Sequence, residues 1–178
     1  MATQPTPGSW TLDAANSRVG LHHKTIWGLV TVAGGFGTVE GAGEIGADGS
    51  ATGRVVVDAV SIDTKHTKRD KHLRSKDFFE VEAHPQIVFE ATTVRPTADG
   101  AVVEGELTIR GVSRKLDFPV QVETEGADAV VLTGKVEIDR ADFGMTWNQL
   151  GMLKGLATID LALRFTPIAA TAPTSPTV

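Results

Sequence analysis

The 178-residue sequence contains no cysteine and no tyrosine, and aromatic residues make up only 6% of the chain. The absence of cysteine excludes disulfides, thiolate metal sites, a cysteine nucleophile and iron–sulfur centres. No segment approaches the ~20 consecutive apolar residues that a helix needs to cross a bilayer. The first ten residues, MATQPTPGSW, lack the basic and apolar stretches of a secretory signal, so we expect a cytoplasmic protein.

An excess of positive charge is also missing. The formal net charge is −5, so we do not expect a nucleic acid, whose phosphates require a basic protein face, as a partner. The length suits one domain. Residues 1–8 and 167–178 are rich in Pro, Thr and Ala, and we predict that they are flexible tails on a single domain spanning residues 9–166.

Alternation of apolar and polar residues is the dominant pattern of the chain. In the stretch KLDFPVQVE, one face carries Leu116, Phe118, Val120 and Val122. Near the end, the apolar positions are Ile159, Leu161, Leu163 and Phe165. A period of two indicates strands with one dry and one wet face, which is typical of antiparallel sheets. We predict strands at 10–14, 17–24, 29–46 (with a break near Gly41), 52–60, 86–95, 101–110, 114–124, 128–139 and 155–165.

One charged segment interrupts this pattern. It predicts a short helix over about 64–75, capped by Asp63 or Thr64 and carrying an i,i+4 pair between Asp70 and Arg74. A single helix cannot cover so long a sheet. The dry face is better buried by curling the sheet into an eight-stranded barrel whose end the helix covers, which makes the chain all-β. A flat β-sandwich is the alternative.

The stretch RDKHLRSKDFFEVEAHPQIVF, residues 69–89, raises the question of catalysis. His72, Asp77 and His84 could serve a small hydrolase or isomerase, but no nucleophile motif, dinucleotide fingerprint or phosphate-binding loop accompanies them. On a helix His66 and His72 would point to different faces, so we expect no metal site. We favour a solvated, salt-bridged face on a segment that covers the barrel.

Four motifs carry a resemblance to a known family. They are SRVGLHHK, the 69–89 stretch, GELTIRGVSRKLDFPV and IDRADFGM, in that order along the chain. Together they resemble the YceI-like family of lipocalin-like proteins over roughly residues 9–165. The resemblance implies an extended eight-stranded antiparallel barrel that holds an isoprenoid chain in an apolar channel. It also implies a homodimer or a stress-response role as candidate properties, because some members show them. Members often carry a histidine where this chain has Thr25, so no role is transferred to His22 or His23.

The expected ligand site is apolar. An eight-stranded barrel either fills with side chains or holds one ligand, and the shortage of bulky residues here favours a channel. The segment 143–155 could form a lip at its mouth. The candidate channel and lid residues are Leu21, Ile26, Trp27, Val30 or Val32, Phe36, Val55, Val57, Leu73, Phe78, Phe79, Leu107, Ile109, Phe143, Met145 and Trp147. Candidate contacts to a pyrophosphate headgroup are Arg69, Lys71, Arg74 and Lys76.

Three hypotheses follow from the sequence. The first is a non-catalytic protein, needing no cofactor, that sequesters or transports a quinone or prenyl diphosphate. The second is the small hydrolase or isomerase. The third is an interaction module with a filled barrel and no ligand.

Overall fold

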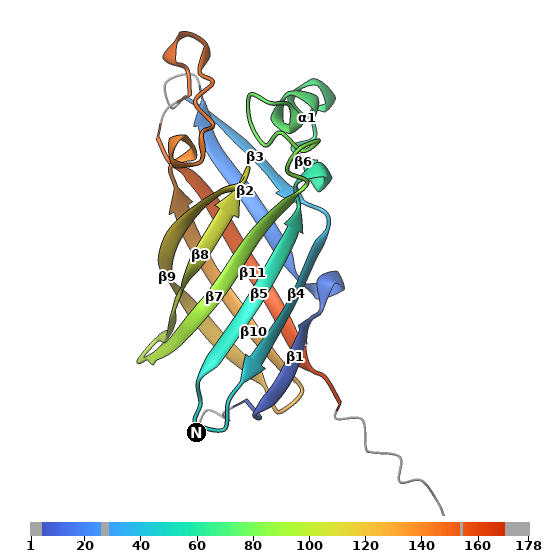
Figure 1. Cartoon of the computed structure of the whole chain (residues 1–178), viewed down its shortest axis with the longest axis vertical. Helices are drawn as coiled ribbons and strands as arrows, with labels where there is room; N and C mark the ends of the chain where they lie inside the picture. Colours follow the sequence, from blue (N-terminus) through green and yellow to red (C-terminus); the bar gives the residue numbers. More distant parts are fainter. Residues whose placement is uncertain (1–4, 26–28, 154, 170–178) are drawn as a thin grey trace, which may run out of the picture.

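The computed structural model of the chain describes residues 5–25, 29–153 and 155–169. In this part of the chain, eleven strands belong to one antiparallel sheet, and one α-helix, α1 (Thr67–Arg74), lies beyond its upper end (Figure 1). The strands are β1 (Gly8–Leu12), β2 (Arg18–Thr25), β3 (Val30–Phe36), β4 (Val39–Ile45), β5 (Ala51–Asp58), β6 (Ile62–Asp63), β7 (Gln86–Thr97), β8 (Gly100–Ile109), β9 (Val112–Glu125), β10 (Ala129–Ile138) and β11 (Ala157–Pro167). Within the same ranges, no helix is long and apolar enough to cross a bilayer.

The sheet closes on itself, so the barrel prediction is confirmed and the flat sandwich is wrong. Among the described strands, eight form the ring, in the order β1-β4-β5-β7-β8-β9-β10-β11 and back to β1. Strands β2, β3 and β6 extend the wall from the upper part of β11. Closure removes the exposed sheet edges that an open sheet would leave. It also gives every strand an inner and an outer face.

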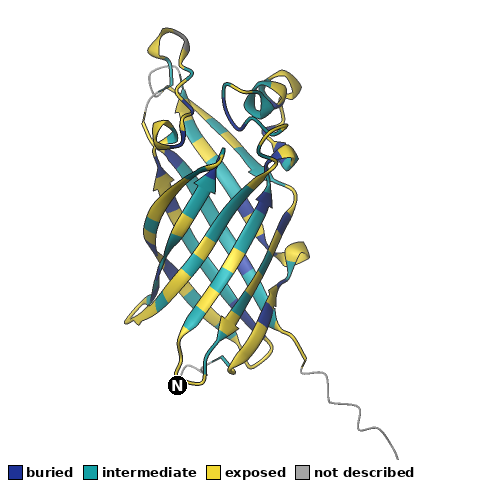
Figure 2. Cartoon of the chain, in the orientation of Figure 1, coloured by how far each residue is buried: buried dark blue, intermediate teal, exposed yellow. Residues whose placement is uncertain are grey.

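The inner face is apolar because the sequence alternates. Exposed and more buried residues follow one another along the strands (Figure 2). In β9 the pattern holds over the predicted positions, with Phe118 and Val120 buried and Asp117 and Gln121 exposed. In β7 a bulge at Thr92 shifts the register, so the inner positions change from Ala91 to Val94.

Two neighbouring strands of the wall are each divided by a break. The break in the 29–46 segment was predicted at the wrong place. The 29–46 segment divides between Phe36 and Val39, not near Gly41. Gly41 instead pairs with Val55 in the middle of β4. The break is fixed by Ser61, whose carbonyl accepts from the Gly37 amide at 3.2 Å and whose hydroxyl accepts from the Thr38 amide at 3.1 Å.

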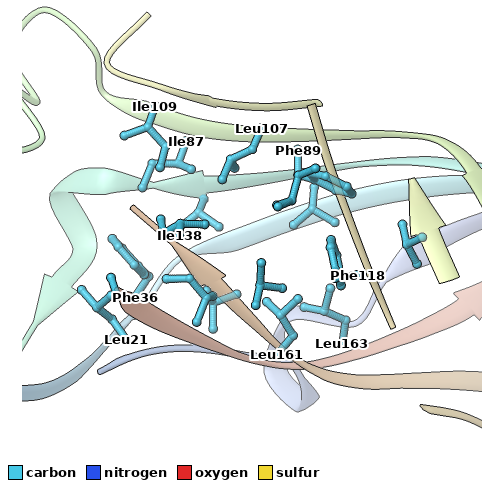
Figure 3. A pocket seen from close by; sticks show the side chains of 18 of the residues that line it. Leu21, Phe36, Ile87, Phe89, Leu107, Ile109, Phe118, Ile138, Leu161 and Leu163 are labelled. Carbon is cyan, nitrogen blue, oxygen red and sulfur yellow. The ribbon is translucent and has the colours of Figure 1, made fainter. Parts of the chain in front are cut away.

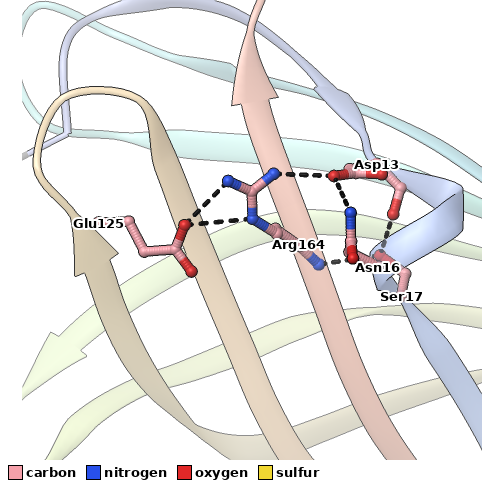
Figure 4. Close-up of polar contacts among 5 residues, drawn as sticks. All are labelled: Asp13, Asn16, Ser17, Glu125 and Arg164. Carbon is pink, nitrogen blue, oxygen red and sulfur yellow. Dashed lines mark hydrogen bonds and ion pairs between the residues drawn. The ribbon is translucent and has the colours of Figure 1, made fainter.

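The other break lies between β1 and β2, at η1 (Ala14–Asn16), where the pairing with β11 is interrupted. Here the Ser17 side chain supplies hydrogen bonds to backbone groups that have no partner in the strand pairing. Its hydroxyl donates to the Asp13 carbonyl at 2.8 Å and accepts from the Arg164 amide at 2.9 Å. The Arg164 guanidinium adds ion pairs to Asp13 and to Glu125, each at 2.8 Å (Figure 4). These contacts join the first strands to the last one.

Helix α1 is shorter than predicted and begins elsewhere. Its N-cap is His66, whose Nδ1 accepts from the Arg69 amide at 3.2 Å, and not Asp63 or Thr64. The Asp70–Arg74 pair is also wrong. Asp70 is buried and accepts from the Thr64 amide at 2.9 Å, while Arg74 donates from Nε and Nη2 to backbone carbonyls of residues 60 and 62. Buried polar groups need partners, and the strand ends supply them here.

Thr64 fastens this segment to the barrel wall. It is 3% exposed, its hydroxyl donates to Asp70, and its methyl group packs over the backbone of β3. A Cβ on Gly34 would lie 2.7 Å from the Thr64 methyl carbon and 2.7 Å from the Asp63 carbonyl oxygen. Only glycine therefore allows α1 to approach β3 so closely.

We predict that Ser17→Ala destabilises the fold by about 1–3 kcal/mol, because it leaves the Arg164 amide without its acceptor and the Asp13 carbonyl without its donor. Urea unfolding followed by tryptophan fluorescence measures the change. The control is Ser9→Ala, at an exposed position of β1, which should change the stability by less than about 0.5 kcal/mol. Equal effects of the two substitutions would contradict the proposed importance of the Ser17 bridge.

Candidate functional site

The barrel encloses an elongated cavity of about 750 Å³. Its wall consists of the inward residues of the strands, among them Phe89, Leu107, Phe118 and Leu161 (Figure 3). Along β11 every second residue from Ala157 to Phe165 lines it, which corresponds to about 27 Å of strand. The cavity is thus a channel along the barrel, of the size of ordinary ligand sites. A filled barrel, as the third hypothesis required, is wrong.

Small inward residues keep the channel open. Gly43 and Gly53 line its lower part, next to Trp10, and Ala91 lies in the wall farther along. An eight-stranded barrel with large side chains at these positions would be full. The small size of the inward residues, which the sequence predicts, therefore leaves an open channel.

The two ends of the channel differ in their coverage. Trp10 and Ile45 line the lower end, near the β4–β5 turn. At the upper end α1 and the following loop lie over the opening, and Leu73, Phe78 and Phe79 line the channel from there. The Phe79 ring meets the Phe36 ring of β3 edge-on, with centroids 5.8 Å apart. The α1 segment is therefore packed into the mouth by its apolar side.

His72 connects this segment with the loop before β11. Its ring lies edge-on to Trp147, with centroids 4.5 Å apart, and to Phe78, at 5.1 Å. Its Nε2 lies 2.9 Å from the Asp77 carboxylate. Three segments of the mouth thus meet at one half-exposed histidine.

Most of the predicted apolar residues lie where a channel ligand would touch them. Those that line the cavity are Leu21, Val32, Phe36, Val55, Val57, Leu73, Phe78, Phe79, Leu107, Ile109, Met145 and Trp147. Phe143 is 3% exposed and packs in the core, so it does not line the channel. Val30 is 44% exposed at the start of β3, so Val32 is the inward member of that pair. Ile26 and Trp27 lie outside the described residues.

Of the predicted basic residues, Arg69 alone lines the channel in the described structure. Its Nε and Nη2 donate to Thr64, each at 2.7 Å. Arg74 is engaged with backbone carbonyls, and Lys71 and Lys76 are exposed outside the channel. The prediction failed for these three because the direction of each side chain depends on how α1 docks.

Several further basic residues that line the channel were not predicted, Arg54 and Lys68 among them. His23 on β2 and Arg140, the first residue of η3 (Arg140–Phe143), both line its upper part. The ring nitrogens of His23 are buried without a normal hydrogen bond. Burial and then the charge of Arg140 lower the pKa of His23, while the Leu156 backbone acts weakly against them. The period-two pattern of β2 could have identified His23 as a channel residue, because Val19 and Leu21 precede it on the inner face.

The three residues predicted for a hydrolase, His72, Asp77 and His84, are not brought together in the described structure. His72 and Asp77 form a pair, but among the described residues no hydrogen bond connects either of them with His84. His84 lies instead against Gly111, at the β8–β9 turn. His66 and His72 both line the channel, because His66 precedes the helix and helical spacing does not apply to it. Within the described ranges, no three His, Asp or Glu side chains are grouped as metal ligands.

Comparison with solved structures places the fold among known barrels. BcnA of Burkholderia cenocepacia superposes with a TM-score of 0.78 over 86% of this chain and 98% of that protein, at 21% identity. A polyisoprenoid binding domain from Saccharophagus degradans gives a TM-score of 0.69 over 89% and 98%, at 19% identity. At these identities the likeness concerns the fold.

Sequence relatives match over shorter stretches. A UPF0312 protein of Yersinia enterocolitica is 42% identical over 74 residues, 42% of this chain and 38% of its own length. One of Serratia proteamaculans is 35% identical over 99 residues, 52% of this chain and 50% of its own. The matches thus cover half or less of these relatives. The model of the YceI-like domain matches residues 10–165, nearly the whole described barrel, and the chain therefore belongs to the YceI-like family.

Proposed function

We propose that this protein binds a long-chain isoprenoid lipid of the quinone or prenyl diphosphate type, and that it sequesters or transports this lipid without catalysis. The continuous apolar channel is the observation that supports the proposal. The Saccharophagus degradans domain of the same fold is described as polyisoprenoid binding, which agrees with it. An isoprenoid tail matches such a wall because neither offers hydrogen-bonding groups.

The energetics favour a long tail. Burial of each methylene is worth about 0.8 kcal/mol, so a twenty-carbon tail gains ~16 kcal/mol before the costs of association. Those costs are about 4–15 kcal/mol. A tail of this length or longer can therefore bind without any polar motif in the wall. A short apolar molecule would gain too little.

We further propose that α1 and the loop to Glu80 act as a lid. Leu73, Phe78 and Phe79 present apolar side chains to the channel, while Lys71 and Lys76 remain in water. The His72–Asp77 pair lies within the lid and orients the His72 ring, which contacts Trp147. Entry of a lipid at this end requires these contacts to open.

The first prediction of this function is co-purification of lipid. An organic extract of freshly purified, never-unfolded protein should contain a stoichiometric prenyl species in mass spectrometry. Protein unfolded, washed and refolded serves as the control. A blank extract that persists after incubation with quinones and prenyl alcohols would contradict the proposal.

Filling the channel should abolish binding. We predict that Leu107→Trp, in the middle of the wall, weakens the binding of a neutral apolar fluorophore at least about tenfold, because the indole occupies the space of the tail. The circular dichroism spectrum should stay native, since the cavity takes up the added volume. Glu106→Trp, the exposed neighbour on β8, is the matched control and should bind like the wild type. Unchanged binding by both variants would place the fluorophore outside the channel.

Loosening the lid should accelerate exchange. We predict that Asp77→Asn raises the rates of fluorophore entry and release up to about fivefold in stopped-flow measurements, because a half-exposed pair contributes about 0–1 kcal/mol. The affinity should change little, since both rates rise together. Asp63→Asn, which alters the exposed Asp63–Lys65 pair outside the channel, is the control and should leave both rates unchanged. Identical rates in all three proteins would argue against a lid at α1.

A further inference from the structure

The charged residues of the channel are divided between its ends. In the described wall, the upper end carries basic or histidine side chains and no carboxylate: His23, His66, Lys68, Arg69, His72 and Arg140. The lower end carries one lining residue of each sign, Glu44 near the end of β4 and Arg54 on β5. An apolar channel thus has one end at which positive charge is concentrated.

Arg140 is the most constrained of these cations. Its Nη1 donates to the backbone carbonyls of Met145 and Trp147, both at 2.6 Å, and so shapes the loop. Among the described residues it forms no ion pair, because the neighbouring Asp139 carboxylate accepts from the Ala141 amide. A partly buried guanidinium without a carboxylate is costly unless an anion compensates it. Burial lowers the pKa of Arg140, although the Asp139 carboxylate acts on the guanidinium through its charge alone.

His23 points to the same conclusion. Its two ring nitrogens are buried in the wall and unpaired in the described structure. Buried polar atoms without partners are rare in proteins, and each of them requires an explanation such as strain, a catalytic role or a bound water or ion. The Leu156 backbone is the one group of the described fold that acts on the ring as a hydrogen-bond partner, so at least one ring nitrogen is available to a bound molecule.

We propose that His23 and Arg140 form the binding site for an oxyanion headgroup, a phosphate, diphosphate or carboxylate, of the lipid whose tail occupies the channel. This inference rests on the proposed function and makes it more specific. Arg140 supplies charge-assisted hydrogen bonds from Nε and Nη2, and His23 supplies a ring N–H. Arg69, whose Nε and Nη2 are engaged by Thr64, adds positive charge at the rim. A neutral quinone would leave Arg140 without a direct ion pair, so the site favours an anion.

The test compares ligands with one tail and different heads. Fluorescence titration of the full chain is carried out with geranylgeranyl diphosphate, geranylgeranyl monophosphate, geranylgeranoic acid and geranylgeraniol. The expected result is that the anionic lipids bind at least about tenfold more tightly than the alcohol. Arg140→Gln should remove this preference, so that its affinities for the anionic lipids and for the alcohol become equal. Lys71→Gln, an exposed cation outside the channel, is the matched control and should keep the preference.

The outcomes separate the two proposals. If the alcohol binds as tightly as the anions, the headgroup site is wrong while the lipid channel stands. If none of the four lipids binds, the proposed function is wrong. The relative affinities of the two phosphates and the carboxylic acid identify the headgroup. Inorganic diphosphate alone should bind at least about tenfold more weakly than its lipid ester, and equal binding would indicate a free-anion site and overturn the proposal.

A second measurement does not depend on the folding of Arg140→Gln, which could disturb the loop. The His23 ring signals of the wild-type protein are followed in an NMR pH titration. Without ligand, its pKa should lie below the ordinary value, because of burial and Arg140. Geranylgeranyl diphosphate should raise this pKa, since its charge offsets the cations that face the site, whereas geranylgeraniol should not. The cations are Arg140 from η3 and Lys68 and Arg69 from the α1 segment, and the titratable side chains His66 and His72 line the same end. An equal pKa with both ligands would overturn the assignment.

Discussion

The closure of the sheet on β11 is the constraint on which the rest of the structure depends. One edge of β11 pairs with β10 and the other with β2 and then β1, so the last strand joins the first two. Where β1 passes into β2 the ladder is interrupted, and the Ser17 hydroxyl carries the connection between Asp13 and Arg164. Without this closure the sheet would still have one apolar face, but that face would not enclose a cavity.

Closure turns a simple alternation into a channel. The inner residues of β7 and β11, which lie four strands apart in the ring, face one another across a space that their own side chains do not fill. The ends of this space are then closed or opened by local structure. At the upper end, the Thr64–Asp70 hydrogen bonds and the close approach to Gly34 hold α1 over the mouth. The same docking inserts Phe79 against Phe36.

The channel is chemically asymmetric, which matters for the lipid that it would hold. Its middle offers contact area alone, so affinity there grows with tail length and discriminates poorly between tails. Its upper end adds Arg140 and His23. Both side chains have polar atoms that form no normal hydrogen bond in the described structure. If the proposed lipid binds, selectivity for the headgroup and capacity for the tail would therefore be separate properties of this barrel, which substitutions would alter one at a time.

The sequence by itself determined the strands and their inner faces, because alternation is a local property. Phe118, Leu161 and most of the proposed lining could be predicted for this reason. The N-cap of α1 and the break in the 29–46 segment were misplaced, because His66 and Ser61 act through contacts that only the fold creates. The tertiary structure alone decided which basic residues enter the channel. Arg140 and His23 are far apart in the sequence, and they share the upper end because β2 and the end of β10 are both neighbours of β11 in the closed sheet.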